Sequence, residues 1–400
     1  MDSFLPTAND SRTIRQLTAF VHGGFILAGA VTILLGPILP MLATRWSLKD
    51  SQTGRFFLAQ FLGAIFGAIV SSYAIPRSGF RISFMSSFFL VAIGVATLGQ
   101  GQWVLSLLSI SVYGTGLGFL SATTNLWTGE ARQPDRAGAL NLVNFSWTAG
   151  AMVCPFLVAL FTARSHLTGL LWAFAGASGF LAIACVFLPL DQSLTALNQS
   201  DKPKIKNVTI PQNRNIFLFG AVFFLWVGTE NAIGGWLATY SHRILISTSN
   251  AWIITPSLFW GGLMLGRAFA PMALKRISEL RVIQSGVLVG IAGIIILMGA
   301  STFRGIASGT VVAGFGFSAV FPVLMSWVVE YYGIAARRIG GQMLGLGILG
   351  GAVLPWLIGY LSTRFGSLKE GLAIVFVTLI ATLILFSLLP RSPADATNIF

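Results

Sequence analysis

Apolar residues occur along this chain in runs of roughly 20, each bounded by a short polar break. A helix of roughly 20 apolar residues crosses a hydrocarbon core about 30 Å thick, so each run predicts one membrane-spanning helix. The pattern predicts an all-α integral membrane protein. The twelve predicted helices cover residues 17–44, 52–75, 82–101, 103–128, 138–163, 167–190, 215–240, 250–273, 282–301, 305–329, 339–362 and 371–390.

The stretch 191–213 is the longest polar break between the predicted helices. It contains two prolines and three lysines and has little apolar periodicity, which is typical of a linker. We therefore expect two domains of six helices each, residues 1–190 and 214–400, joined by this linker. The first apolar run is too long for the core of a signal peptide, so we expect no cleavage.

The composition supports a membrane location. Hydrophobic residues make up 55% of the chain, charged residues make up 9%, and the mean hydropathy is +0.80. A water-soluble globule of 400 residues needs more polar surface than this composition supplies. The lipid bilayer is therefore the expected surrounding of the helices.

The net charge of +13 reflects basic loops rather than a nucleic-acid-binding surface. The basic residues are spread over the loops and form no stripe with interleaved aromatics, so we expect no nucleic-acid partner. If both termini lie inside, sixteen Lys and Arg fall on the inner side and eight in the outer loops. This bias places both termini and the linker in the cytoplasm of a multi-pass plasma (inner) membrane protein, which we expect to be a monomer.

The two halves of the sequence resemble each other. Gly150, Pro155 and Arg164 precede Gly350, Pro355 and Arg364 by 200 residues. Gly63 and Gly67 precede Gly262 and Gly266 by 199, and the Gly116–Phe119 stretch precedes Gly314–Phe317 by 198. Near-equal offsets in one order favour a duplication and predict two pseudo-symmetric six-helix bundles facing a central path.

The stretch WVGTENAIGGWLATY, residues 226–240, gives the chain a family resemblance. It is similar to the Tyr-Val-Gly-x-Glu-x-x-x-Gly-x-Trp-x-x-Tyr pattern in helix 7 of the fucose permease-type sugar symporters, a branch of the major facilitator superfamily. RAGALNLVNFSWTAGAMVCP, residues 136–155, resembles the loop into helix 5 of that branch. PRSGFR, residues 76–81, stands at the superfamily's Asp-Arg-x-Gly-Arg loop, with Pro76 in place of the acid. The resemblance covers essentially the whole chain and implies the major facilitator fold and sugar transport.

Glu230 is the one acid placed deep in a predicted helix, because the other eleven lie in tails, loops or helix ends. Members of the branch can carry one acid in helix 1 and another in helix 4. The acid in helix 4 stands four residues before an asparagine. Here helix 1 has no acid, and Ser121 stands four residues before Asn125. An ionisable group inside the membrane is by default a functional candidate, so we expect Glu230 to couple transport to H⁺ or Na⁺. Thr229 and Asn231 are candidate oxygen ligands for Na⁺, and a purely structural role for Glu230 is the alternative.

Neutral polar residues at membrane depth form the candidate substrate site. Amides donate and accept hydrogen bonds with hydroxyl groups, and aromatic faces cover the C–H side of a sugar ring. No basic residue lies in the predicted central path, which favours a neutral polyol over an anion. The alternative is that the amides bond between helices and the tryptophans anchor helix ends. The candidates are Gln60, Thr124, Asn125, Asn144, Trp147, Asn231 and Trp236.

Arg267 lies within the predicted helix 250–273, one or two turns from its inner end. We interpret its side chain as reaching the membrane interface, with pairing inside a gate as the alternative. Cys154 and Cys185 have no metal-binding spacing, and His22 is expected near the inner end of its helix. No Gly-Lys-Ser/Thr motif is present, so we expect no ATP-driven pump, no enzyme and no cofactor or metal.

The sequence predicts a twelve-helix secondary transporter that imports a neutral sugar by alternating access and is coupled to a cation through Glu230. A proton-coupled exporter of lipophilic drugs would share the fold. A passive sugar uniporter would use Glu230 only structurally. A non-transporting sugar receptor would bind the ligand without moving it.

Overall fold

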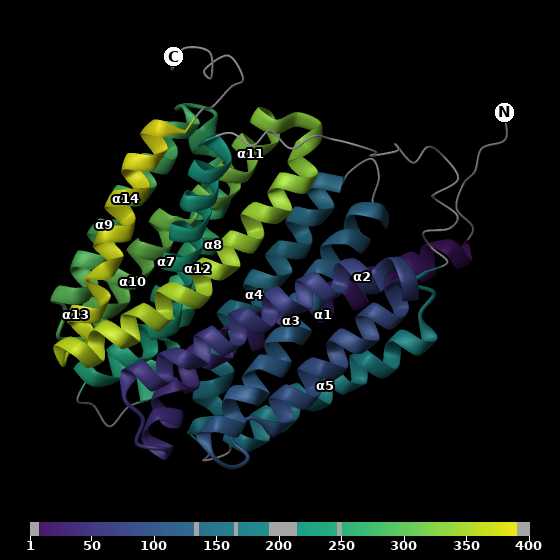
Figure 1. Ribbon diagram of the computed structural model, residues 1–400, viewed down its shortest axis with the longest axis horizontal. Coiled ribbons are helices and arrows are strands. Elements are labelled where there is room, and N and C mark those ends of the chain that lie inside the picture. The colour runs from purple at the N-terminus through teal and green to yellow at the C-terminus, as the bar shows by residue number, and fades with distance from the viewer. Residues whose placement is uncertain (1–7, 132–135, 164–166, 192–213, 246–249, 390–400) are drawn as a thin grey trace. The chain divides into compact units, whose positions relative to one another are not determined.

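The computed structural model describes residues 8–131, 136–163, 167–191, 214–245 and 250–389. These residues form helices almost throughout (Figure 1). In lipid, every backbone N–H and C=O group must be satisfied within the protein, and a helix does so within one segment. The helices are α1 (Ala8–Arg45), α2 (Asp50–Thr97), α3 (Trp103–Ala131), α4 (Arg136–Thr162), α5 (Leu167–Phe187), α7 (Arg214–Ile244), η1 (Asn250–Ile254), α8 (Thr255–Leu274), α9 (Glu279–Gly299), α10 (Phe303–Phe317), α11 (Val320–Tyr332), η2 (Gly333–Ala335), α12 (Ala336–Phe365), α13 (Leu368–Leu372) and α14 (Ile374–Leu388).

Eleven segments of the described chain are long and apolar enough to span a membrane. The longest of them, the 48-residue α2, contains the predicted helix 52–75 and most of the predicted helix 82–101, which it leaves at Thr97. Gly79 divides it, with φ 78° and ψ 178°. The twelve-helix prediction is therefore confirmed, with one pair of helices joined end to end at a kink.

The kink at Gly79 is held by an acid from a distant part of the chain. Asp191, just beyond α5, accepts hydrogen bonds through Oδ1 from the backbone nitrogens of Phe80 at 2.6 Å and Arg81 at 3.3 Å. The Arg81 guanidinium donates to the Leu188 carbonyl at 3.2 Å. A carboxylate on free N–H groups at a helix start satisfies donors that have no partner within the helix. Asp191 thus brings a carboxylate to the loop in which Pro76 replaces the expected acid.

The predicted helix 305–329 is interrupted between α10 and α11. Pro322, one turn beyond the break, has no N–H to donate to the carbonyl of Ser318. The Ser318 nitrogen bonds the Phe315 carbonyl at 3.3 Å, a tighter turn than the α-helix. The break is therefore a local change of helical geometry within one span.

The duplication predicted from the sequence recurs in the packing of the helices. A Cβ added to Gly150 on α4 would overlap the Ile26 carbonyl oxygen of α1, and one added to Gly350 on α12 would overlap the Phe224 carbonyl oxygen of α7. The same holds for Gly63 against Ser111 and Gly262 against Val311. Small residues at these positions let helix backbones approach closely. Each pair of contacts repeats after 198 to 200 residues.

The contacts correct the alignment of one repeated stretch. A Cβ on Gly116 would meet Ser87 and Val91, and a Cβ on Gly316 would meet Gly286 and Gly290. Gly116 therefore corresponds to Gly316, at an offset of 200, whereas the sequence pattern placed Gly118 opposite Gly316. The local motif Gly-x-Gly-Phe misled the alignment because each helix has glycines two residues apart.

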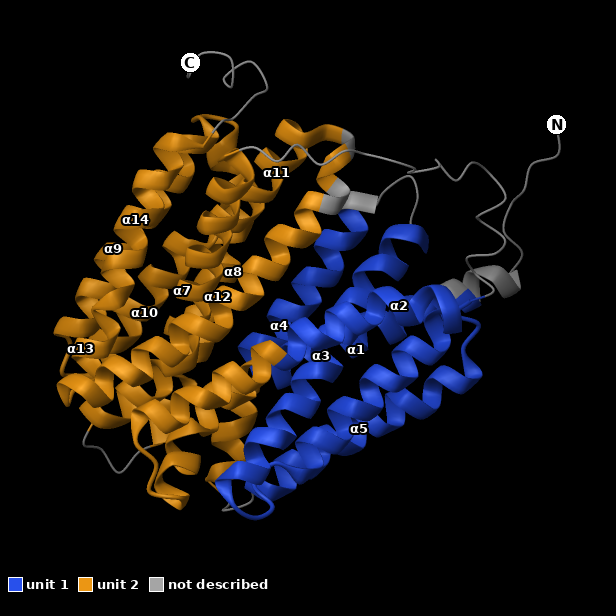
Figure 2. Ribbon diagram, viewed as in Figure 1, with its two compact units in different colours: residues 1–32, 63–153, 166–203 blue, residues 33–62, 154–165, 204–400 orange. Residues whose placement is uncertain are grey.

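The chain divides into two compact units (Figure 2). Unit 1 comprises residues 1–32, 63–153 and 166–203, and unit 2 comprises residues 33–62, 154–165 and 204–400. Residues 192–213 of the predicted linker lie outside the described residues. The division into domains 1–190 and 214–400 stays a prediction.

Candidate functional site

Glu230 lies near the middle of α7, within unit 2, and its side chain is half-buried. The residues around it on the helix are apolar or small, including buried Trp226 and Gly234. The apolar residues of α7 make this segment long enough to span the bilayer, where a helix satisfies its backbone groups. Glu230 does not contribute to helix formation. The structure thus places an ionisable group at membrane depth, as the sequence predicts.

Helix α8 runs antiparallel to α7. The Ser241 and Thr255 hydroxyls are hydrogen-bonded at 3.2 Å, and further along, a Cβ on Gly234 would lie 3.4 Å from the Trp260 ring. Moving toward the start of α7 therefore means moving toward the end of α8. In that direction, Glu230 lies about one turn from Gly234 on α7, and Arg267 lies about two turns from Trp260 on α8.

Arg267 is the charged neighbour of Glu230. The two side chains interact electrostatically, and the side chain of Arg267 is half-buried. Because side chains on a helix tilt toward its N-terminus, a long arginine at this position is able to reach back along α8 toward the level of Glu230. This interaction favours the alternative interpretation of Arg267, pairing with another group, over a side chain that only reaches the membrane interface. Sequence spacing gave no signal for this partner because it stands on another helix.

The residues beside Glu230 in the sequence are engaged elsewhere. Thr229 shares a 2.7 Å hydrogen bond with Thr378 of α14 and donates to the Leu225 carbonyl at 2.6 Å. Asn231 donates through Nδ2 to the Val227 carbonyl at 2.8 Å. No cluster of three or more His, Cys, Asp or Glu side chains that could hold a metal ion occurs among the described residues.

Trp236 packs inside unit 2. Its ring is fully buried, its Nε1 donates to the Pro355 carbonyl at 2.8 Å, and its centroid lies 6.0 Å from that of Phe57. The ring presents no exposed face to a sugar in this structure, so the geometry favours a packing role. Gln60, on α2 one turn from Phe57, is also buried, at 2% exposure. Their assignment to substrate binding stays a prediction.

Two of the candidate amides meet in unit 1. Asn144 of α4 lies with its Nδ2 3.5 Å from Oδ1 of Asn125 on α3. Each amide also donates to a carbonyl one turn back on its own helix, at 2.8 and 2.9 Å. Asn144 is exposed and Asn125 is half-buried, so both retain surface for a ligand. Thr124, at 1% exposure, is buried beside them, and Trp147 is half-buried.

A hydrogen bond between a histidine and a serine in unit 1 was not predicted from the sequence. Nδ1 of His22 on α1 lies 2.7 Å from Oγ of Ser146 on α4. Ser146 also donates to the Leu142 carbonyl at 3.2 Å. A polar bond between two spanning helices is a common means of joining them. The serine gave no signal in the sequence, since a hydroxyl is frequent in apolar helices.

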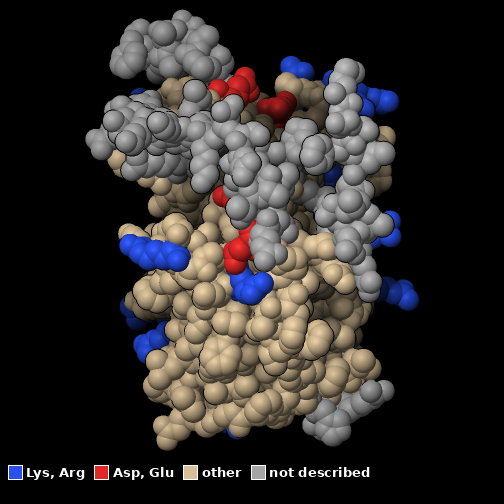
Figure 3. All heavy atoms as spheres, turned by 90° about the vertical axis from the view of Figure 1, so that its right-hand side faces the viewer, with Lys and Arg blue, Asp and Glu red and all other residues tan. Residues whose placement is uncertain are grey.

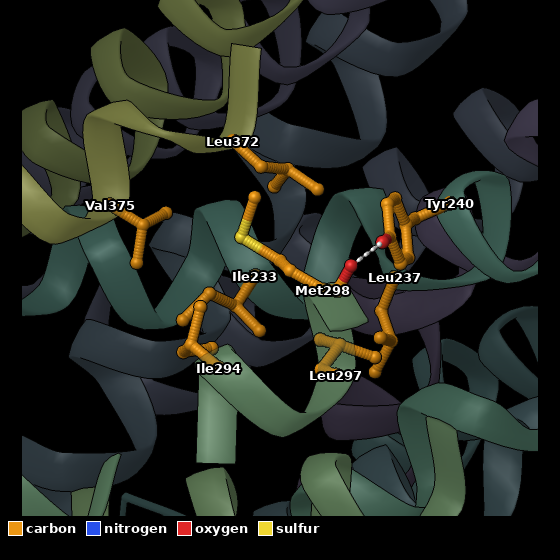
Figure 4. Close-up of a pocket in the computed structure, with 8 residues that line it drawn as sticks. All are labelled: Ile233, Leu237, Tyr240, Ile294, Leu297, Met298, Leu372 and Val375. Atoms are coloured by element: carbon orange, nitrogen blue, oxygen red, sulfur yellow. Dashed lines mark hydrogen bonds between the residues drawn. The ribbon is translucent and has the colours of Figure 1, made fainter. Parts of the chain in front are cut away.

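The cavity in Figure 4 lies between α7, α9, α13 and α14 and is not a sugar site. Its volume is about 10 Å³, which is close to the space one water molecule occupies. Apolar side chains line it, and the Tyr240 hydroxyl is turned to the Met298 carbonyl at 3.3 Å. Neither its size nor its lining suits a molecule that carries several hydroxyls.

The charged side chains are unevenly distributed on the face in Figure 3. The lower half of that face is almost entirely uncharged, whereas acidic and basic side chains lie mainly above it or along its edges. An uncharged surface of this kind is suited to lipid. The spanning helices, the repeated packing and the polar groups at membrane depth are typical of a membrane transporter.

Comparison with known proteins agrees with this class. The model of the Major Facilitator Superfamily matches residues 21–340, and the chain belongs to that superfamily.

Three similar proteins carry sugar transport or the same superfamily in their names. The glucose/galactose transporter of Brucella abortus biovar 1 (strain 9-941) is 26% identical over 366 residues, which cover 86% of each chain. Sodium-dependent glucose transporter 1A of Mus musculus is 21% identical over 414 residues, covering 92% of this chain and 94% of the mouse protein. The structure of the superfamily transporter FucP has a TM-score of 0.62 at 17% identity and covers 93% of this chain and 98% of FucP.

Proposed function

We propose that this chain imports a neutral hexose such as glucose or galactose by alternating access, and that protonation of Glu230 couples import to the proton gradient. The observation that carries the coupling is the position of Glu230, an acid in the middle of a spanning helix. The names of its sugar-transporting relatives support the substrate class.

The charge balance at membrane depth supports a neutral substrate. The positive charge of Arg267 is offset by Glu230, with which it interacts. An anionic substrate would therefore find no uncompensated positive charge there. The exposed amide of Asn144 and the half-buried amide of Asn125 offer the donors and acceptors that sugar hydroxyls need.

The contacts of Glu230 favour a proton over Na⁺ as the coupling ion. Sodium requires several oxygen ligands. Of the two expected helpers, Thr229 is hydrogen-bonded to Leu225 and Thr378, and Asn231 uses its Nδ2, not its Oδ1, in the bond to the Val227 carbonyl. The guanidinium of Arg267 would also repel a second cation held at Glu230. A proton needs only the carboxylate. Its arrival removes the negative charge with which Arg267 interacts, which gives the two protonation states different interactions.

The direction of transport follows from symport with protons, and the proposed topology identifies the cytoplasmic side. The excess of basic residues in the inner segments supports cytoplasmic termini and location in the plasma (inner) membrane. Protons then enter the cell down their gradient with the sugar.

The test is a Glu230→Gln variant reconstituted in liposomes, since glutamine keeps the shape and hydrogen bonding but does not titrate. The variant should exchange labelled glucose or galactose across the membrane but lose accumulation driven by an imposed H⁺ gradient. An imposed Na⁺ gradient should drive accumulation in neither protein. Glu330→Gln, which removes an exposed acid at the end of α11, is the matched control and should accumulate sugar as the parent does.

Glu230→Gln leaves Arg267 without its opposite charge, which can destabilise the fold. The double variant Glu230→Gln/Arg267→Gln removes both charges and separates loss of coupling from loss of folding. Accumulation at the parental level in either variant, with an unchanged response to pH and Na⁺, would show that Glu230 is not the coupling group. Binding without any flux in the parent would favour the receptor, and flux without accumulation the uniporter.

A further inference from the structure

An ion pair joins the ends of three helices within unit 2. Asp50, the first residue of α2, accepts from both ends of the Arg243 guanidinium at the end of α7, at 2.5 and 2.8 Å. Ser362, near the end of α12, donates a short hydrogen bond to the same carboxylate. The Asp50 side chain is 8% exposed and that of Arg243 is 44% exposed.

The backbones around this carboxylate are in close contact. The Ser51 nitrogen donates to the Thr363 hydroxyl at 2.8 Å. A Cβ added to Gly359 would overlap the Asp50 carbonyl oxygen, and one added to Gly54 would lie 3.2 Å from the Cα of Trp356. The side chain of Asp50 is thus enclosed by α12 on one side and capped by Arg243 on the other.

We propose that Asp50, Arg243 and Ser362 form a latch that holds the ends of α2, α7 and α12 together in one transport state and is released in the other. Alternating access requires helix ends on one side of the membrane to separate while those on the other side close. Asp50 belongs to the predicted domain 1–190 and its two partners to the predicted domain 214–400, so this contact breaks if those two domains are the parts that move apart. This inference concerns the conformational equilibrium and does not depend on the identity of the sugar or the coupling ion.

The geometry makes the three residues unequal. Without Arg243, the buried Asp50 charge keeps only a serine as its side-chain partner, and burying a charge without an opposite charge is unfavourable. Without the Asp50 charge, the half-exposed guanidinium of Arg243 is still hydrated. Loss of the arginine should therefore open the latch more than loss of the acid.

Thiol accessibility in purified protein measures this opening without a substrate. Thr53→Cys places a probe one turn from Asp50, at a position 1% exposed, and Gln60→Cys places a second probe deeper on α2, at 2% exposure. Cys154 and Cys185 are fully buried and supply a low background in reaction with N-ethylmaleimide. Lys49→Cys, at an exposed site, reports the intrinsic reactivity of the reagent.

Arg243→Gln should speed labelling of both buried probes by about tenfold, a change equivalent to about 1.4 kcal/mol in the closed-to-open equilibrium. Asp50→Asn should speed it less, by about threefold, because the exposed arginine is easily hydrated. Arg364→Gln removes an exposed arginine from the same end of α12 and should leave both rates unchanged. The Lys49→Cys probe should react equally in all backgrounds.

Labelling of Thr53→Cys and Gln60→Cys in the Arg243→Gln background within about twofold of the Arg364→Gln rates would overturn the latch. Faster labelling at Thr53 alone would also overturn it, since that result shows only fraying of the first turn of α2. If Arg243→Gln does not fold, Ser362→Ala takes its place, with about a threefold increase expected at both probes. Unchanged rates in that variant would refute the proposal.

Discussion

Replacing Gly350 by alanine tests the helix packing on which the repeated architecture depends. The added Cβ would overlap the Phe224 carbonyl oxygen and lie 2.8 Å from its carbonyl carbon. Ordinary contact between carbon atoms begins at about 3.5 Å, so α7 and α12 must separate by at least about 0.7 Å. Both obstacles are backbone atoms, which cannot rotate away as a side chain would.

The expected loss of stability combines two opposing effects. Inserting a methyl group into a tightly packed contact costs about 1–3 kcal/mol, and a rigid backbone neighbour favours the upper end. Alanine recovers up to about 1 kcal/mol because its helix propensity is higher than that of glycine. We expect Gly350→Ala to lower the free energy of unfolding by about 2 kcal/mol. Gly345 lies on the same helix, and a Cβ added there would have nothing within 4 Å. Gly345→Ala should leave the free energy of unfolding unchanged or raise it slightly.

The duplicated partner sharpens the test. Gly150→Ala would place its Cβ 2.7 Å from the Ile26 carbonyl carbon, so its cost should equal that of Gly350→Ala. The two glycines lie in different compact units, and the double variant should lose the sum of both, about 4 kcal/mol.

The assay is reversible unfolding in mixed micelles, followed by circular dichroism. Gly176→Ala, with open space around it, is the control in unit 1. The reasoning fails if Gly350→Ala is as stable as Gly345→Ala, or if only one of the two duplicated glycines is sensitive.

Three further outcomes are expected. Asn125→Ala or Asn144→Ala should weaken sugar binding by about 1–3 kcal/mol in equilibrium dialysis, because a substrate hydroxyl loses its partner. Unchanged affinity in folded variants would assign both amides to helix packing. A cysteine at Ser200 should react with an impermeant thiol reagent only after the cell membrane is opened, whereas labelling of intact cells would reverse the proposed topology. Asp191→Ala should lower the free energy of unfolding by about 1–2 kcal/mol, as loss of a helix cap does, because the Phe80 nitrogen loses its acceptor; stability equal to that of the parent would remove this role.

The identity and number of the helices could be read from the sequence. Each apolar run is long enough to cross the bilayer, and lipid allows no other local structure for such a run. The same physics marks Glu230, since a lone acid in an apolar run is visible without knowledge of the fold. The duplication was visible too, because close helix contacts require small residues, as at Gly150 and Gly350.

Only the tertiary structure decided which side chains meet. Lipid tails are as apolar as the interior of the protein, so the sequence of a spanning helix does not show which face packs against another helix. The partner of Glu230 is Arg267 on the next helix, and the partners of Asp50 lie roughly 200 and 300 residues away in the chain. Such pairs depend on how each helix is rotated and how far it slides along its neighbour. Those quantities are set by packing among several helices at once, and no single segment encodes them.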